Sequence, residues 1–375
     1  MQTSHLREGP GIIVHATNVL GAGAALVACR LIEGIALAGA GRLRVEAWLP
    51  DDPRYRAWTA GFGGVQCRLV RRLLPRPVSR FVETILRPPA LPSGDHVLVL
   101  GDLPLRRVPN QTVFIHLAHL VSPRVDPFVS RALAYRLQRA ILRRNLAFAK
   151  SVVVQTVAMR DAIGRSYPAQ INSIHVIGQP SPLPPIEIPH RRRGPGETLR
   201  LLYPARGMPH KNHRLLLAVA RRCEQERLPV EFCVTLNQPE GARLLRGAAP
   251  NVRNLGVLNE EELVQAYGEC DALFFPSLVE SYGLPLVEAM TIGRPIIAVD
   301  RPYARALCED GAVYFDPASE QSAVAAVRRV LVWGTGRAEE GCKAALARLP
   351  GTWTETAARF LDAMGVWPKA PGPDC

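Results

Sequence analysis

Short apolar runs alternate with longer amphipathic stretches along this chain, and the alternation predicts strands and helices in turn. In the first half, buried strands are predicted at residues 11–18, 42–50, 96–102, 112–119, 151–156 and 173–180. Helical spacing occurs at 21–39 and at 131–149, and the second of these stretches is basic. A strand, a glycine-containing turn and a helix in that order are typical of a Rossmann-like unit.

The same alternation returns in the second half. It predicts strands at 199–205, 230–236, 272–277 and 295–300, with helices at 213–226, 260–270 and 283–293. The intervening stretch is rich in proline and arginine and has no periodicity, which indicates a linker. We therefore expect an α/β protein with two doubly wound Rossmann-like domains that face a crevice at the carboxyl ends of their strands.

This pattern divides the chain into four parts. We expect one domain at 1–180, a linker at 181–198 and a second domain at 199–352. Residues 353–375 are predicted to form a helix that packs back toward the first domain, followed by a tail.

Composition narrows the class of protein. The 375 residues suit two domains, and the formal net charge of +13 suits an anionic partner, although an arginine-rich genome would give the same charge. No uncharged apolar run reaches the roughly 18 residues of a membrane span, and the first residues lack the layout of a signal peptide. The eight cysteines include no CxxC pair, which indicates reduced thiols in a cytoplasmic protein.

The stretch "ESYGLPLVEAM" at 280–290 is the first candidate for chemistry. Glu280 directly follows a predicted strand, and Gly283 and Pro285 suit a tight turn and the first turn of a helix. The free N–H groups of such a helix bind phosphate. Glu288, one turn further on, could accept hydrogen bonds from the paired hydroxyls of a ribose or sugar. The alternative is a plain helix N-terminus with a solvated Glu288.

A second candidate loop, "YPARGMPHKNHRLL" at 203–216, also follows a predicted strand. It places Arg206 and Lys211 five positions apart before a helix. Two cations at the end of a strand suit a diphosphate, which both can contact with charge-assisted hydrogen bonds. The alternative is a pair of exposed surface cations.

Together these segments resemble the family 4 retaining glycosyltransferases, which have the two-Rossmann GT-B fold. The resemblance rests on the Glu-x7-Glu signature "ESYGLPLVE", on "ARGMPHK", on "GVLNEEELVQAYGECDALFFPS" and on "GAVYFDP". It is close over residues 199–331 and extends to the rest only in layout. "PARGMPHKNH" looks like bacterial mannosyl- and rhamnosyl-type transferases of surface polysaccharides.

The resemblance implies roles for the C-terminal candidates. Arg206 and Lys211 would hold the donor diphosphate, Glu280 would face the transferred sugar, and Glu288 would hold the nucleotide ribose. The backbone that would meet the sugar and phosphate belongs to Ser281, Tyr282, Gly283 and Leu284.

It also implies roles in the N-terminal half. The family often has a glycine-rich first turn, for which Gly21 and Gly23 are the nearest match, although they are not adjacent. The family also often has a histidine from this half in the crevice, and His116 ends a predicted strand on the side of the crevice, with His119 as its rival.

The implied reaction transfers a hexose, with mannose favoured, from a nucleotide diphosphate sugar to a hydroxyl of a glycan or lipid-linked acceptor, with retention at the anomeric carbon. Side-chain cations and a helix N-terminus would stabilise the leaving diphosphate, so no metal and no cofactor are expected. The one acidic pair considered for a metal, Asp51 and Asp52, precedes a proline and reads as a turn. The alternative function is a non-catalytic nucleotide-sugar-binding subunit of a glycan-assembly complex.

Residues 65–87 carry six arginines among apolar residues. A basic amphipathic segment would bind the anionic inner face of the cytoplasmic membrane, where lipid-linked acceptors lie; the alternative is an ordinary helix pair with solvated arginines. Nucleic acid is not expected as a partner, because no zinc knuckle, helix-turn-helix signal or interleaved aromatic set accompanies the charge.

Overall fold

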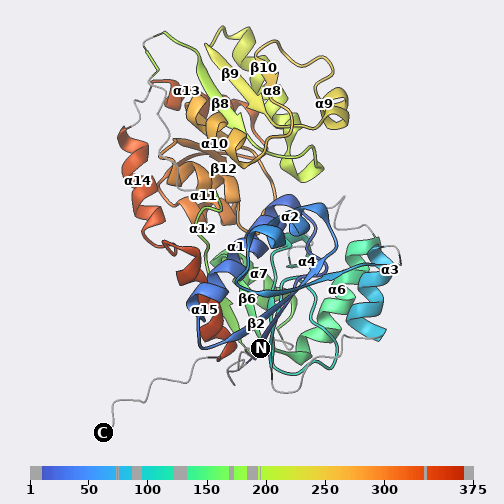
Figure 1. Cartoon of the computed structure of the whole chain (residues 1–375). Coiled ribbons are helices and arrows are strands. Elements are labelled where there is room, and N and C mark those ends of the chain that lie inside the picture. The colour runs from blue at the N-terminus through green and yellow to red at the C-terminus, as the bar shows by residue number, and fades with distance from the viewer. Residues whose placement is uncertain are drawn as a thin grey trace. The chain divides into compact units, whose positions relative to one another are not determined.

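The computed structural model describes residues 11–72, 74, 76–86, 95–121, 133–168, 173–183, 193–194, 196–332 and 336–366. The chain divides into two compact units, one of residues 1–180 with 350–375 and one of residues 181–349 (Figure 1). Each unit is a parallel sheet covered by helices, so the predicted α/β class with two Rossmann-like domains is confirmed.

The sheet of the N-terminal unit has the strand order β3-β2-β1-β4-β5-β6-β7 and is parallel throughout. Its strands are β1 (Gly11–His15), β2 (Arg44–Pro50), β3 (Gln66–Val70), β4 (His96–Val99), β5 (Gln111–Phe114), β6 (Ala149–Val154) and β7 (Ile174–Val176). The order reverses between β1 and β4, which defines the topological switch point where such sheets bind ligands.

Helices and turns join these strands. They are α1 (Ala22–Ala38), α2 (Pro53–Gly61), α3 (Arg76–Phe81), a π-helical turn η1 (Val82–Leu86), α4 (Ala118–Val121), α6 (Leu133–Asn145), a 3-10 turn η2 (Leu146–Phe148), α7 (Val157–Ser166) and α15 (Trp353–Met364). The six strands and the two helices predicted for this half are all present, with bounds that differ by up to five residues from the predicted ones.

One interpretation of the sequence was wrong. Residues 65–87 do not form a single amphipathic segment or a helix pair, because residues 66–70 are the edge strand β3 and pair with β2. Along β3 most side chains are exposed, so the strand lacks the apolar alternation that marks a buried strand. Only the second part of the segment is helical, in α3 and η1.

The last helix belongs to the N-terminal unit. α15 lies along α1. The backbone of Trp353 approaches Gly34 so closely that a Cβ on residue 34 would lie 2.4 Å from the Trp353 carbonyl oxygen. The ring of Phe360 packs edge-on against Phe114 in β5, with 5.4 Å between centroids. α15 is therefore part of this core, although the whole other unit, residues 181–349, precedes it in the chain.

The C-terminal unit contains a six-stranded parallel sheet with the order β10-β9-β8-β11-β12-β13. The strands are β8 (Leu199–Tyr203), β9 (Val230–Val234), β10 (Val252–Asn254), β11 (Ala272–Phe275), β12 (Ile296–Val299) and β13 (Ala312–Phe315). Every strand predicted in this half is present, and the order again reverses once, between β8 and β11.

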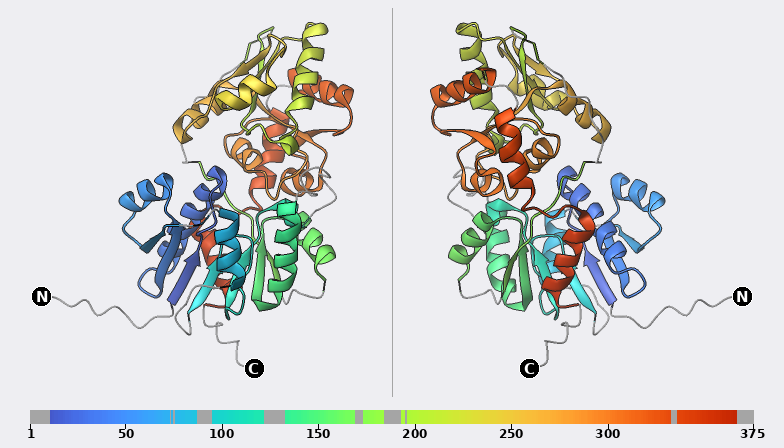
Figure 2. Two further views of the ribbon diagram at one scale, coloured as in Figure 1. Left: turned by 90° about the vertical axis from the view of Figure 1, so that its right-hand side faces the viewer. Right: turned by 90° about the vertical axis from the view of Figure 1, so that its left-hand side faces the viewer.

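Seven α-helices and one short turn are described in this unit. They are the 3-10 turn η3 (Pro209–Lys211), α8 (His213–Gln225), α9 (Gln238–Leu244), α10 (Glu260–Glu269), α11 (Leu284–Thr291), α12 (Pro302–Cys308), α13 (Glu320–Val332) and α14 (Gly336–Leu346). Figure 2 shows the helices on both faces of the sheet. The core is continuous from β8 to α14 and fixes the loops at the carboxyl edge of the strands.

Candidate functional site

The two loops singled out from the sequence of the C-terminal unit flank its switch point. Arg206 and Lys211 follow β8, and Glu280 follows β11, the neighbouring strand. Since parallel strands end at the same edge of a sheet, the reversal of strand order between β8 and β11 leaves an opening between the loops that follow them. The fold therefore gathers residues that are about 70 positions apart in the chain.

A direct ion pair joins the two loops. The Lys211 ammonium donates a hydrogen bond to Oε1 of Glu280, and the Ser277 hydroxyl donates to the same oxygen at 2.6 Å. The backbone supports the pair, because Leu278 N donates to the His210 carbonyl at 2.8 Å and the buried Tyr203 hydroxyl donates to the Lys211 carbonyl at 2.6 Å. Lys211 and Glu280 thus have fixed positions before any ligand arrives.

The two cations of the first loop differ in their surroundings. The Lys211 side chain is 20% exposed, whereas the Arg206 side chain is 71% exposed and its nearest carboxylate, Glu240, lies 3.7 Å from Nε. A long ion pair in solvent holds a guanidinium weakly. Arg206 can therefore reach a bound anion without losing a strong contact. Lys211 can bind the anion only if it gives up its ion pair with Glu280.

The second loop turns into α11 through Gly283. Gly283 has φ +100°, a conformation in which a side chain is strained, and it stands immediately before the first residue of α11. Pro285 occupies the first turn, where a missing N–H costs nothing. Ser281 and Leu284 are partly exposed, whereas the Tyr282 side chain is buried in the core, so Tyr282 would offer a ligand only its backbone.

Glu288 lies in the middle of α11 and is only 5% exposed. Among the described residues only the Tyr267 hydroxyl donates to its side chain, to Oε2 at 2.8 Å. Burial raises the pKa of Glu288 to about 7, against the opposing effect of the Tyr267 hydrogen bond. Tyr267 is held in turn by Arg294, whose Nε donates to its carbonyl at 2.9 Å. The predicted alternative of a solvated Glu288 is therefore wrong.

This burial has an energetic meaning. A carboxylate that is removed from water and given one hydrogen-bond donor destabilises the fold when it is ionised, and an uncharged glutamine of the same shape would destabilise it less. Expensive polar groups of this kind are typical of functional sites, where ligand binding compensates the cost.

In the N-terminal unit His116 lies in the loop after β5. Its backbone N donates to Asp102 Oδ1 at 2.8 Å, and its Nδ1 lies 3.5 Å from the same oxygen. Asp102 follows β4 and has φ +64°, so the loops after two adjacent strands meet at this pair. His119 is instead 5% exposed and packs against the ring of Tyr135, which is the environment of a core residue.

Gly21 and Gly23 lie at the N-terminus of α1, after β1. Gly21 is the N-cap residue and both glycines are exposed, so the N–H groups of the first turn of α1 are open at the same edge of the sheet as His116. A Cβ on Gly21 would meet no atom closer than 3.7 Å, so the structure itself imposes no need for glycine at this position.

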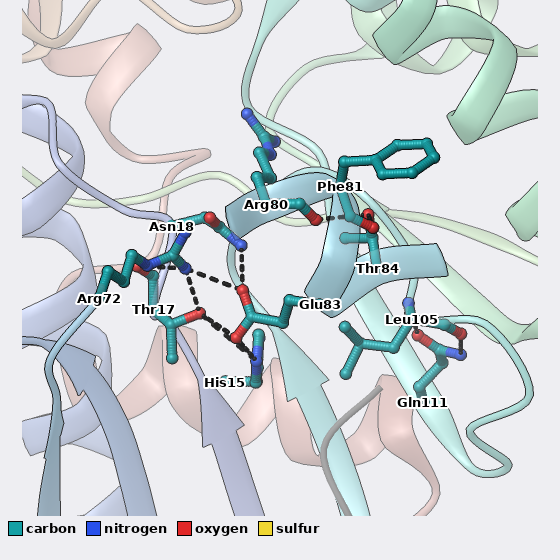
Figure 3. Close-up of polar contacts among 10 residues, drawn as sticks. All are labelled: His15, Thr17, Asn18, Arg72, Arg80, Phe81, Glu83, Thr84, Leu105 and Gln111. Carbon is teal, nitrogen blue, oxygen red and sulfur yellow. Dashed lines mark hydrogen bonds and ion pairs between the residues drawn. The ribbon is translucent and has the colours of Figure 1, made fainter. Parts of the chain in front are cut away.

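A partly buried polar cluster that was not predicted from the sequence lies at the ends of β1 and β3 (Figure 3). Glu83 in η1 accepts hydrogen bonds from Thr17 at 2.7 Å, Arg72 at 2.8 Å, and His15 and Asn18 at 3.0 Å. Although burial alone would raise its pKa, these hydrogen bonds and the charges of His15 and Arg72 lower the pKa of Glu83 to about 2. The cluster ties the ends of β1 and β3 to η1.

A signal for this cluster does exist in the sequence. Glu83 is the sole acidic residue between Asp52 and Asp95, in a stretch with many arginines. A lone carboxylate among cations is a candidate for a structural ion pair. The sequence pattern does not identify which arginine is its partner.

The described residues contain no group of three or more histidine, cysteine, aspartate or glutamate side chains that could hold a metal ion. Asp52 caps α2 by accepting from Arg54 N at 3.1 Å, and Asp51 pairs with Arg56. The acidic pair considered for a metal therefore has structural partners. A surface hollow lined by Arg200, Glu231 and Asn251 lies at the opposite edge of the C-terminal sheet, away from the loops described above.

Comparisons with known proteins agree with this geometry. Residues 187–336 match the model of the family described as glycosyl transferases group 1. The O-antigen chain mannosyltransferase RfbU of Salmonella typhimurium is 35% identical over 69 residues, which cover 18% of this chain and 20% of that protein.

Solved structures match over nearly the whole chain. Sucrose-phosphate synthase from Thermosynechococcus elongatus superposes with a TM-score of 0.69 at 17% identity and covers 94% of this chain and 98% of its own. WaaG, a glycosyltransferase involved in lipopolysaccharide biosynthesis, has a TM-score of 0.63 at 14% identity and covers 95% of this chain and 100% of its own.

These likenesses define the class: the protein has the GT-B fold of two Rossmann-like units. Within this fold, residues 187–336 are similar to the glycosyl transferases group 1 family, whose model they match. The resemblance to glycosyltransferases of this fold, which the Glu-x7-Glu signature indicated, is thereby confirmed.

Proposed function

We propose that the protein transfers a hexose from a nucleotide diphosphate sugar to a hydroxyl of a glycan or lipid-linked glycan, with retention at the anomeric carbon. The observation that carries this proposal is the pairing of Lys211 with Glu280 at the switch point of the C-terminal unit. Lys211 supplies a cation for the diphosphate and Glu280 a carboxylate for the sugar hydroxyls, and the two side chains are hydrogen-bonded to each other.

The donor diphosphate would displace Glu280 as the partner of Lys211, and the mobile Arg206 would close on it. As the bond between the anomeric carbon and the diphosphate oxygen breaks, its electron pair leaves with the diphosphate. Both cations and the N–H groups at the start of α11 stabilise the charge that develops there. The oxygen of the acceptor bonds to the anomeric carbon on the same face, and its proton passes to the departing phosphate oxygen.

The released Glu280 would accept hydrogen bonds from the transferred sugar, while Ser277 keeps it oriented. Glu288 would receive the ribose hydroxyls, which supply the donors that its buried carboxylate lacks. In the N-terminal unit the pair of His116 and Asp102 is the candidate contact for the acceptor.

A mannose-type donor and a surface-polysaccharide acceptor are the specific form that we propose. They are supported by the likeness of a short segment to an O-antigen chain mannosyltransferase. The loop "PARGMPHKNH" supports the same form, because it resembles the corresponding loop of bacterial mannosyl- and rhamnosyl-type transferases.

An assay of nucleotide diphosphate release tests the proposal. The protein is incubated with GDP-mannose, UDP-glucose, UDP-N-acetylglucosamine and dTDP-rhamnose in EDTA, with and without added magnesium or manganese. We expect release from one donor, unchanged by EDTA, and a product of the donor's anomeric configuration by NMR. An inverted product would refute retention, and activity that requires added metal would refute catalysis by side-chain cations alone.

The same assay separates the alternative, a non-catalytic nucleotide-sugar-binding subunit. Calorimetric binding of a donor without turnover, in the presence of an extract that contains acceptors, would favour that alternative. The presence of Arg206, Lys211, Glu280 and Glu288 together in the C-terminal unit favours the enzyme.

A further inference from the structure

Exposed apolar side chains gather on one side of the N-terminal unit. Twelve large hydrophobic side chains are exposed in the part of the chain that the structure describes, and six of them lie in two short segments. Leu69 lies in β3, and the others are on the segment that follows β3 and on α6: Leu74, Val78, Leu86, Leu133 and Leu137. These last five define what we call the apolar–basic face.

The two segments are neighbours in space. Asn145 at the end of α6 donates a hydrogen bond from Nδ2 to the Thr84 carbonyl of η1 at 3.1 Å. Figures 1 and 2 also show α3 and α6 next to each other. The exposed apolar side chains of both therefore lie on neighbouring elements of the same unit.

The helices of this surface carry several arginines and one carboxylate, Glu83 of η1, which is paired inward with Arg72 and His15. Residues 133–145 contain no aspartate or glutamate, and residues 66–82 contain none either. On α6 the exposed arginines Arg136, Arg143 and Arg144 recur at helical spacing with Leu133 and Leu137, while Ile141 and Leu142 point into the core. Arg71 is exposed beside α3.

Two arginines of the same region do not belong to this face. Arg72 donates to Glu83 and Thr17 (Figure 3). Arg80 donates to the Gly101 carbonyl, so the guanidinium groups of both arginines are engaged within the unit. The cations on the surface are therefore fewer than the sequence of residues 65–87 suggested, and α6 supplies the larger share.

We infer that the apolar–basic face docks the protein onto an anionic lipid bilayer. Leucine and valine side chains enter the boundary between headgroups and acyl chains, and the surrounding arginines remain at the phosphates. A second copy of this chain is a poorer occupant, because it would bring the same uncompensated arginines into contact. The inference concerns binding alone and does not depend on the proposed transfer reaction. No helix among the described residues is long and apolar enough to cross a membrane.

Vesicle flotation with the full chain tests this inference. The probes are vesicles of phosphatidylcholine with about one third phosphatidylglycerol, and vesicles of phosphatidylcholine alone. We expect binding to the anionic vesicles at low salt, weaker binding at high salt and little binding to the neutral ones. Failure of the parent protein to float with the anionic vesicles at low salt would overturn the inference.

Variants then locate the surface. The combination of Arg136→Gln, Arg143→Gln and Arg144→Gln should weaken binding on the order of a hundredfold, since each cation near such a surface contributes roughly a factor of five. Leu133→Glu with Leu137→Glu should also abolish flotation. The matched control is Val257→Glu with Val332→Glu, two exposed apolar residues of the other unit, which should bind as the parent does.

Circular dichroism melts confirm that each variant is folded. Retention of full vesicle binding by both α6 variants would overturn the inference. Light scattering adds a further outcome: a parent that is dimeric without lipid, and α6 variants that are monomeric, would make this face an interface between copies instead.

Discussion

Lys211 and Glu280, 69 positions apart in the chain, form an ion pair that closes the switch point of the C-terminal sheet. In this arrangement each side chain neutralises the other. In the proposed reaction a donor substrate would break this ion pair, because its phosphate would bind Lys211 and a hydroxyl of its sugar would bind Glu280. Two further carboxylates govern stability: Glu288, which is buried, and Glu83, which is partly buried.

Removal of the lysine should disable the donor site. Lys211→Ala loses one charge-assisted contact to the diphosphate, worth roughly 3 kcal/mol in an enclosed site, so kcat/KM should fall on the order of a hundredfold. Lys343→Ala, at an exposed lysine of α14, is the matched control and should be neutral. Turnover of Lys211→Ala at the parent's rate, with normal circular dichroism, would exclude Lys211 from the donor site.

Substitution of the two signature glutamates, Glu280 and Glu288, should change different kinetic constants. Glu280→Gln removes a contact beside the anomeric carbon, where positive charge grows in the transition state, so it should mainly lower kcat. Glu288→Gln removes a contact to the ribose that is similar in both states, so it should mainly raise the donor's KM. Steady-state kinetics of both variants with one donor decide this. If both change only KM, Glu280 positions the donor and has no part in the chemical step.

The burial of Glu288 predicts a gain in stability on its removal. Its folded-state pKa of about 7 exceeds its usual value of 4.5, so the parent should lose stability as the pH rises from about 4.5 to about 7. Glu288→Gln escapes that loss. The free energy of unfolding of Glu288→Gln should exceed that of the parent by up to about 3 kcal/mol at pH 8 and by little at pH 4.5.

Denaturant unfolding of both proteins at pH 4.5 and pH 8 measures this difference. Glu269→Gln, at an exposed position of α10, is the control and should follow the parent at both values. Equal stability of Glu288→Gln and the parent at pH 8 would mean that Glu288 is not desolvated in solution.

Glu83 should behave in the opposite sense. Its folded-state pKa of about 2 lies below its usual 4.5, so its contribution is complete above about pH 4.5 and is lost as the pH falls toward 2. Glu83→Gln should therefore destabilise the N-terminal unit by about 3 kcal/mol at pH 7 and by roughly half as much at pH 3. Thermal melts at the two pH values test this, and a constant difference between them would contradict it.

The sequence by itself determined most of the fold. Buried parallel strands such as β1, β8 and β12 are short apolar runs, and the helices between them have regular spacing, so local pattern is sufficient to predict them. β3 could not be predicted in this way, because an edge strand with exposed side chains has no apolar alternation to detect.

The sequence also identified the loops of the candidate site, since glycine, proline and charged residues directly after a strand are a local signal. The tertiary structure alone decided how those residues pair. Lys211 meets Glu280, Glu288 is buried against Tyr267, and Arg72 turns inward to Glu83. Each of these contacts depends on strand order and on burial, which come from packing between distant segments, and no local pattern contains that information.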